Sequence, residues 1–206
     1  MTSPAARAFT IVELLTVIAI VSVLISVSVW GSGSFMRNIY LGEGMHDLVA
    51  ELGRGRQAAI SDNHDVEIRF YLTTDAEAKT SVYRSFQLFE YDDTGSAHPL
   101  DKVHWLPTGI VLNGNATVSP LLAPEQRKVW SGASDTKPSI PGFGFDYDAC
   151  SFRFRAGGGT DLTAATAQCF VTLQSRNDGA DRPDLPANYA TVQVDPGNGT
   201  VRSYRP

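Results

Sequence analysis

The sequence is poor in cysteine and histidine, and no recognised catalytic grouping is found among them. Two cysteines are too few for a disulfide scaffold, but a single bridge between Cys150 and Cys169 would suit the oxidising side of a membrane. The pairing cannot be read from sequence, and a bridge is favoured over catalysis. Neither the cysteines nor the histidines have the spacing of a metal site or a nucleophile and base. We therefore expect no enzyme activity, metal or cofactor. The histidines are His46, His64, His98 and His104.

Charge is absent from a long stretch near the N-terminus. The 17 residues from Leu14 to Trp30 carry no charged side chain, and as a helix they would span about 25 Å, close to the thickness of a bilayer core. Arg7 and the amino terminus precede this stretch, and no basic cluster follows it directly. This charge distribution predicts a single-pass segment at residues 9–30 in the cytoplasmic membrane, with the bulk of the protein outside the cytoplasm.

A secretory signal peptide is the rival interpretation of the first 30 residues. However, the small residues Ala6 and Ala8 lie before the apolar run, where signal peptidase could not use them. The run also exceeds the usual length of about 7 to 15 residues. A plain membrane anchor does not explain Glu13, a carboxylate at the head of an apolar helix, because a charge buried there is costly.

The stretch from Ala8 to Leu15, AFTIVELL, resembles the type IV prepilin processing site. In that family a membrane peptidase cuts the chain before Phe and methylates the new amino group. The resemblance implies removal of residues 1–8, cleavage between Ala8 and Phe9, and N-methylation of Phe9. Glu13 would then be fifth in the mature chain and would accept a neighbouring subunit's ammonium group during assembly. The family usually has Gly before the cut, so Ala8 is a departure.

Apolar residues at three- and four-residue steps predict that the helix continues as an amphipathic segment at residues 31–61. Its apolar stripe would lie on a sheet, with the charged face mostly in water. That charged face comprises Glu43, Asp47, Glu51 and Arg54. Three Gly-x-Gly pairs recur eleven residues apart on nearly one face, which indicates either close packing or local helix breaks. The pairs are Gly31 and Gly33, Gly42 and Gly44, and Gly53 and Gly55.

Beyond Asn63 the pattern changes to a period of two residues, which indicates a strand at 66–72 in which Glu67, Arg69 and Tyr71 face away from the apolar side. Turn signals separate further short runs. These runs lie at 82–91, 103–106, 110–112, 151–155, 169–174, 189–194 and 200–204. The predicted fold class is α+β, with a long N-terminal helix packed on an antiparallel β-rich domain at residues 62–206, which we expect to be a two-sheet sandwich.

The helix end at 48–60, followed by the strand at Val66, resembles pseudopilin H and FimT-type minor pilins. The segments at 66–71 (VEIRFY), 91–95 (YDDTG), 152–155 (FRFR) and 194–206 are similar to the Verru_Chthon cassette protein D family, over most of the chain. These resemblances imply a pseudopilin H-like fold. They also imply a structural subunit, a minor pilin or pseudopilin, in a type II secretion or type IV pilus-like filament in the periplasm or at the cell surface. Its partners would be prepilin peptidase, the inner membrane, and other pilin-like subunits bound through the N-terminal helix.

Two alternative functions remain open. Arginines alternate with aromatic or polar residues near two strand ends, and on paired strands they would suit single-stranded nucleic acid, which FimT-like competence pilins bind. The arginines are Arg153, Arg155, Arg202 and Arg205. Alternation on a half-exposed strand explains the same pattern without a ligand and is preferred. The other alternative is a membrane-anchored extracytoplasmic β domain with no filament role. Acidic loops at 146–148 and 177–181 offer calcium ligands, although solvated loop acids are the preferred interpretation.

Overall fold

A computed structural model describes residues 10–74, 80–130, 132, 134–163 and 169–206, without the side chains of residues 27–34. The chain divides into two compact units, Met1–Arg37 and Asn38–Pro206. The predicted cleavage site at Ala8 and Phe9 lies outside the described residues. The predicted membrane segment at residues 9–30 lies partly outside them as well. Within the described part of the chain, no helix is long and apolar enough to cross a membrane.

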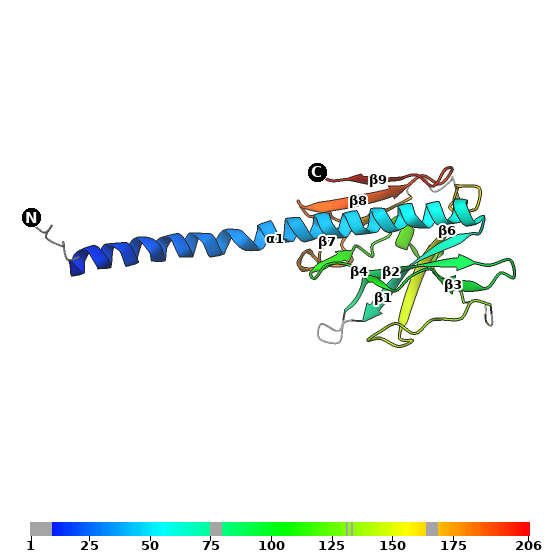
Figure 1. The fold of residues 1–206 in the computed structure, drawn as a ribbon, viewed down its shortest axis with the longest axis horizontal. Helices are drawn as coiled ribbons and strands as arrows, with labels where there is room; N and C mark the ends of the chain where they lie inside the picture. The colour runs from blue at the N-terminus through cyan, green and yellow to red at the C-terminus, as the bar shows by residue number, and fades with distance from the viewer. Residues whose placement is uncertain (1–9, 75–79, 131, 133, 164–168) are drawn as a thin grey trace, which may run out of the picture. The chain divides into compact units, whose positions relative to one another are not determined.

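One helix, α1 (Ile11–Asp62), contributes to both units (Figure 1). Its first turn is capped by Thr10, whose Oγ1 accepts a hydrogen bond from the backbone N–H of Glu13 at 3.2 Å. The helix ends where Asn63 adopts a left-handed conformation, with φ 56°, a common way to terminate a helix. The helix therefore ends at Asp62, next to the predicted end near Ser61. The interpretation of the Gly-x-Gly pairs as helix breaks is wrong, because the helix is continuous through all six glycines.

The described residues of the second unit form nine strands joined in one antiparallel sheet, of order β6-β1-β2-β5-β7-β8-β9, with β3 and β4 also paired to β2. The strands are β1 (Val66–Thr74), β2 (Ser81–Tyr91), β3 (Ala97–Pro99), β4 (His104–Trp105), β5 (Ile110–Leu112), β6 (Tyr147–Phe154), β7 (Phe170–Ser175), β8 (Tyr189–Val194) and β9 (Val201–Tyr204). Short 3-10 helices lie in the connections: η1 (Pro120–Leu122), η2 (Pro124–Gln126) and η3 (Arg176–Asp178). The α+β class with an antiparallel sheet is confirmed.

The expected two-sheet sandwich is wrong, because β5 joins the two halves of the sheet. Leu112 pairs with Tyr83 of β2, and Ile110–Leu112 also pairs with β7. Strand β5 therefore continues the hydrogen bonding from one half into the other.

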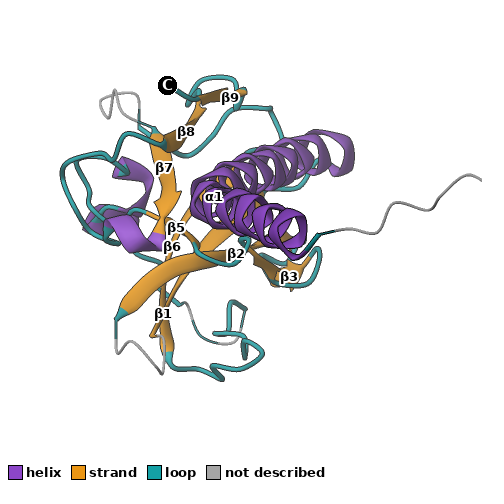
Figure 2. Cartoon of the chain, turned by 90° about the vertical axis from the view of Figure 1, so that its left-hand side faces the viewer, coloured by secondary structure: helices purple, strands orange, loops and turns teal. Residues whose placement is uncertain are grey.

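The second half of α1 lies along one face of this sheet (Figure 2). Its buried positions recur at steps of three and four residues, as expected for a helix face. They are Leu41, Gly44, Leu48, Leu52, Gly55 and Ala59. A Cβ at Gly55 would meet Leu88 Cδ2 at 2.9 Å, and one at Gly44 would meet Pro107 Cδ at 3.2 Å. These two glycines therefore serve close packing of the helix against the sheet.

Strand β1 is buried on both faces. Val66, Ile68 and Phe70 join the main core with α1, whereas Tyr71 packs in a second cluster with Tyr147 on the opposite side. The predicted alternation of the two faces is confirmed, although the residues facing away from α1 are also covered. This covered second face contains the charged groups described below.

Candidate functional site

The first half of α1 presents apolar side chains in every direction. Eleven large apolar residues are between 46% and 82% exposed. They are Ile11, Val12, Leu14, Leu15, Val17, Ile18, Ile20, Val21, Val23, Leu24 and Ile25. A helix that is apolar all round needs cover from lipid or from other helices. Glu13 is the acidic residue of the first turn, where the helix dipole favours a negative charge.

The two cysteines are buried and are not joined by a disulfide bond, so the expected bridge is not found. Cys150 lies on β6, and Cys169 directly precedes β7. In the sheet, β1, β2 and β5 stand between those two strands. Cys150 Sγ instead lies 3.2 Å from the hydroxyl of Tyr83, and burial raises the pKa of the Cys150 thiol. Cys150 therefore behaves as a core residue.

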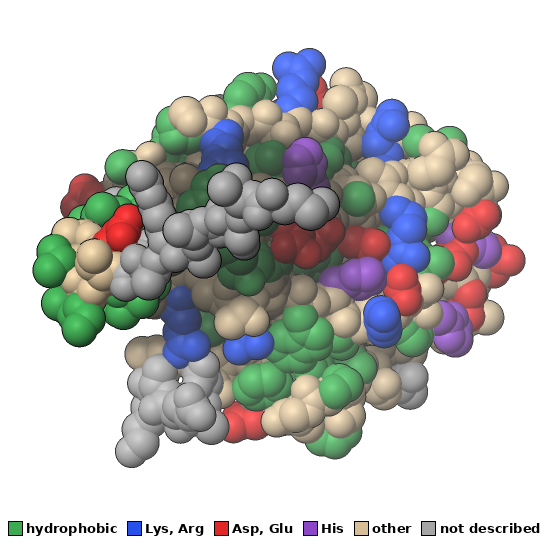
Figure 3. Space-filling view, turned by 60° about the vertical axis from the view of Figure 1, so that its left-hand side comes forward, with side chains coloured by type: hydrophobic (Ala, Val, Ile, Leu, Met, Phe, Trp, Pro, Cys, Tyr) green, Lys and Arg blue, Asp and Glu red, His purple; other side chains and the backbone are tan. Residues whose placement is uncertain are grey.

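The four arginines considered for nucleic-acid binding do not lie on paired strands, which corrects that expectation. Strand β6 pairs with β1, whereas β9 pairs with β8. The guanidinium group of Arg153 stacks on the ring of Tyr91 at 3.9 Å, and Arg205 donates hydrogen bonds to Asn38 O and Asn188 Oδ1. On the face drawn in Figure 3, Lys and Arg side chains are scattered and do not form a patch. No cationic stacking surface results from β6 and β9 together.

A groove of about 560 Å³ does lie over β7, β8 and β9. Phe170, Tyr189 and Tyr204 supply aromatic side chains to its lining, which also includes Arg205. The groove is mainly apolar and carries one charged residue.

A neutral cluster of four charged groups is buried on the sheet face opposite α1. Arg69 Nε lies 2.6 Å from Glu67 Oε2, and Arg69 Nη2 lies 2.7 Å from Asp135 Oδ1. Lys128 Nζ lies 2.8 Å from Glu67 Oε1 and 2.5 Å from Asp135 Oδ2. Burial alone would raise the pKa of Glu67 and of Asp135, but the two cations outweigh it and lower both pKa values. The cluster holds the segment carrying Lys128 and Asp135 onto the sheet.

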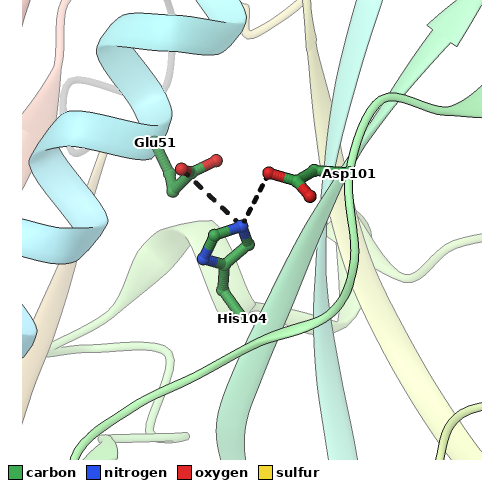
Figure 4. A group of neighbouring side chains, drawn as sticks. All are labelled: Glu51, Asp101 and His104. Atoms are coloured by element: carbon green, nitrogen blue, oxygen red, sulfur yellow. Dashed lines mark hydrogen bonds and ion pairs between the residues drawn. The ribbon is translucent and has the colours of Figure 1, made fainter.

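A second charged cluster joins α1 to the connection between β3 and β4, and Figure 4 shows its three side chains pointing toward one another. His104 Nε2 lies 3.3 Å from Asp101 Oδ2 and 3.7 Å from Glu51 Oε1. All three donor atoms lie within 4.8 Å of one another. The backbone N–H of Lys102 and the imidazole of His104 lower the pKa of Asp101.

Sequence reasoning missed this cluster, because it placed Glu51 on the face of α1 that is mostly in water. The Glu51 side chain is only 13% exposed. The expectation of no metal site considered only the spacing of the cysteines and histidines along the chain, whereas the structure places His104 beside two carboxylates. Neither acidic loop considered for calcium belongs to the group.

The turn that follows α1 contacts the β2–β3 hairpin through a third group. His64 Nδ1 lies 2.8 Å from Glu90 Oε1, and His64 Nε2 lies 3.3 Å from Asp93 Oδ1. The hydrogen bond with Glu90 is the main reason that the pKa of His64 is raised. His98 forms a separate exposed pair with Asp92.

Comparison with known proteins gives similarity of fold only. No protein-family model matches the chain, and no curated protein matches it by sequence. Two solved structures of the minor pseudopilin EpsH from the type II secretion system of Vibrio cholerae are similar. One has 10% identity and a TM-score of 0.44, covering 81% of this chain and 97% of that one. The other has 14% identity and a TM-score of 0.43, covering 83% and 96%. Similarity at this level does not establish function.

Proposed function

We propose that this protein is a pilin-like subunit of a filament, a minor pilin or pseudopilin, processed by a prepilin peptidase and held in the cytoplasmic membrane before assembly. The observation that carries this proposal is the bare apolar surface of α1 between Ile11 and Ile25. Lipid covers such a surface in the membrane, and the helices of other subunits cover it in a filament. The sheet domain is then extracytoplasmic.

The polar groups within this half of α1 suit an environment without water. The hydroxyls of Thr16, Ser22 and Ser26 donate hydrogen bonds to backbone carbonyls one turn earlier in the same helix. They therefore need no partner from solvent. The absence of charge continues to Trp30 in the sequence. A segment of this kind can move from lipid into a helix bundle without leaving these hydroxyl groups without a hydrogen-bond partner.

Glu13 is the exception, and its position explains how subunits would be placed relative to one another. Cleavage after Ala8 would leave a mature chain that begins one residue before the cap, Thr10, so the helix would start almost at once. The new ammonium group would lie at the helix N-terminus, where the dipole disfavours positive charge. The carboxylate of Glu13 on an adjacent subunit would compensate that charge, and the pairing would define the axial step between subunits.

Processing is tested by coexpressing the full chain with a prepilin peptidase and determining the N-terminus by mass spectrometry. The expected mature chain begins at Phe9 and carries an N-methyl group. A cut between Gly31 and Ser34 would contradict the proposal, because it would indicate an exported soluble domain.

The assembly role is tested with Glu13→Ala and the matched control Glu43→Ala, which removes an exposed acid further along the same helix. We expect Glu13→Ala to be cut normally but to enter sheared filaments poorly, as measured by immunoblotting of filament and membrane fractions. Losing one partner of a buried pair costs about 3 to 5 kcal/mol, against at most about 1 kcal/mol for a surface pair. Equal incorporation of Glu13→Ala and wild type would refute the pairing.

A further inference from the structure

We propose that Glu51, Asp101 and His104 form a binding site for a divalent transition metal, with Zn²⁺ as the best-matched ion. The three side chains come from α1, from the connection after β3, and from the first residue of β4 (Figure 4). Two carboxylates and one imidazole are a donor set of the kind found in zinc sites with three protein ligands and one open position. Zinc binding here would not depend on filament assembly.

The distances suit a tetrahedral ion. Zinc binds carboxylate oxygen and imidazole nitrogen at about 2.0 to 2.2 Å, which places neighbouring donor atoms about 3.3 to 3.6 Å apart. His104 Nε2 is already 3.3 Å from Asp101 Oδ2 and 3.7 Å from Glu51 Oε1. The remaining separation, between the two carboxylates, is no more than 4.8 Å. Small side-chain rotations that move the carboxylate oxygens by about one ångström or less would bring all three donor atoms to these separations.

The ligands are held by their surroundings. The His104 ring stacks nearly parallel on Phe86, with centroids 5.8 Å apart and an interplanar angle of 9°, and the two residues pair across β2 and β4. Glu51 stands next to Leu52, which is fully buried under the sheet. Asp101 Oδ1 accepts a hydrogen bond from the backbone N–H of Lys102 at 2.6 Å. Ligands positioned in this way lose little freedom when a metal binds.

The charge of the site favours a cation. With a neutral imidazole the two carboxylates contribute −2, and Arg54 contributes +1. The guanidinium group lies 2.9 Å from Glu51 Oε2 and 2.9 Å from Asp101 Oδ2. Glu51 Oε1 therefore faces His104 without competition from Arg54, whereas Asp101 Oδ2 is shared between Arg54 and His104, so a bound ion must displace the guanidinium group from that oxygen. The two carboxylates and Arg54 together leave a net charge of −1. The side chains of Glu51, Asp101 and His104 are 13%, 34% and 25% exposed, so an ion can enter from solvent.

The donor set also predicts which ions bind poorly. Calcium requires six to eight oxygen ligands, and magnesium keeps several waters on an all-oxygen octahedron. A site with one nitrogen and two carboxylates selects zinc, cobalt or copper over both. A bound ion would link α1 to the connection between β3 and β4, so metal binding would stabilise the packing of the helix on the sheet.

The test uses the full chain in detergent micelles, without a histidine tag and stripped of metal. Zinc is titrated against a chromophoric chelator, and cobalt is added separately to record its visible spectrum. We expect one zinc per wild-type chain and the intense absorption of tetrahedral cobalt. His104→Gln, Glu51→Gln and Asp101→Asn keep the size of each side chain. Each should weaken zinc binding by more than the roughly 10- to 100-fold effect of losing an outer-shell partner.

His98→Gln is the matched control, because His98 is exposed and pairs with Asp92 outside the site. It should bind zinc as wild type does. Circular dichroism of every variant verifies that the fold is retained. The proposal is overturned if wild type binds no zinc, if His104→Gln and His98→Gln bind it equally, or if calcium competes with zinc at equal concentration.

Discussion

Two glycines two residues apart in α1 provide a matched test of how closely the helix approaches the sheet. Gly53 and Gly55 both lie inside α1, but their surroundings differ. A Cβ built at Gly53 meets nothing within 4 Å, whereas one at Gly55 lies 2.9 Å from Leu88 Cδ2 and 3.5 Å from Phe154 Cδ2. Leu88 and Phe154 are fully buried, so they have little room to move. Substitution by alanine should therefore stabilise the fold at Gly53 but not at Gly55.

The magnitudes follow from two terms. Replacing glycine by alanine inside a helix stabilises by about 1 kcal/mol through helix propensity, and at Gly53 this is the whole effect. At Gly55 the added methyl group also overpacks the core, which costs about 1 to 3 kcal/mol. Gly53→Ala should raise the free energy of unfolding by about 1 kcal/mol, whereas Gly55→Ala should leave it unchanged or lower it by up to about 2 kcal/mol.

Urea denaturation of residues 31–206 measures the difference, provided that this fragment, which carries the complete sheet and the packed half of α1, unfolds cooperatively. With an m-value of about 2 kcal/mol/M, Gly53→Ala should move the midpoint upward by about 0.5 M. Gly55→Ala should move it by nothing or downward. If both variants are stabilised equally, the close approach at Gly55 does not exist and the packing described for α1 is wrong.

The remaining predictions concern charged groups. Lys128→Met leaves two buried carboxylates with only one cation, so it should lower the free energy of unfolding by about 3 to 5 kcal/mol in the same urea assay; a loss below about 1 kcal/mol would mean that the cluster is solvated. Because the pKa values of Glu67 and Asp135 are lowered in the folded state, their contribution is present above the ordinary carboxyl pKa near 4 and is lost as pH falls through the folded-state values. Thermal melting between pH 2 and 7 should show this loss, and a flat profile in that range would contradict it. The raised pKa of His64 has the opposite sign: its contribution is complete below about 6.5 and is lost as pH rises through the folded-state value, which an NMR titration of the ring in wild type and in Glu90→Gln would detect.

Local patterns predicted most of the elements. The change from three- and four-residue steps to a period of two lies between Ala59 and Val66, and the structure ends α1 at Asp62 and begins β1 at Val66. Strands β5 and β8 match the predicted ranges, because turn signals border both. By contrast, Ala97–Pro99 was missed, since three residues including a proline give no recognisable alternation.

What escaped sequence reasoning depends on contacts between distant segments. The choice between one sheet and two depends on the pairing of Tyr83 with Leu112, which no local pattern encodes. Lys128 contacts Glu67 although the two residues are 61 positions apart in the chain. The alternation of polar and apolar residues in β1 therefore gave no sign that a distant segment covers the polar face of the strand. Glu51 was assigned to water because helix periodicity says nothing about a loop that folds over the charged side of the helix.

The pattern of burial along α1 connects the packing of the helix to the proposed metal site. A Cβ would lie 3.2 Å from Pro107 Cδ at Gly44 and 2.9 Å from Leu88 Cδ2 at Gly55, so the helix is closely packed at both positions, and Glu51 lies between them. A helix held at both points cannot slide or rotate without displacing core residues such as Leu88. The carboxylate of Glu51 is therefore carried on a rigid element, at a fixed distance from the strand that carries His104. If Gly55→Ala shifts the helix to relieve the contact with Leu88, zinc affinity should fall even though no ligand has changed, whereas Gly53→Ala should leave it unaltered.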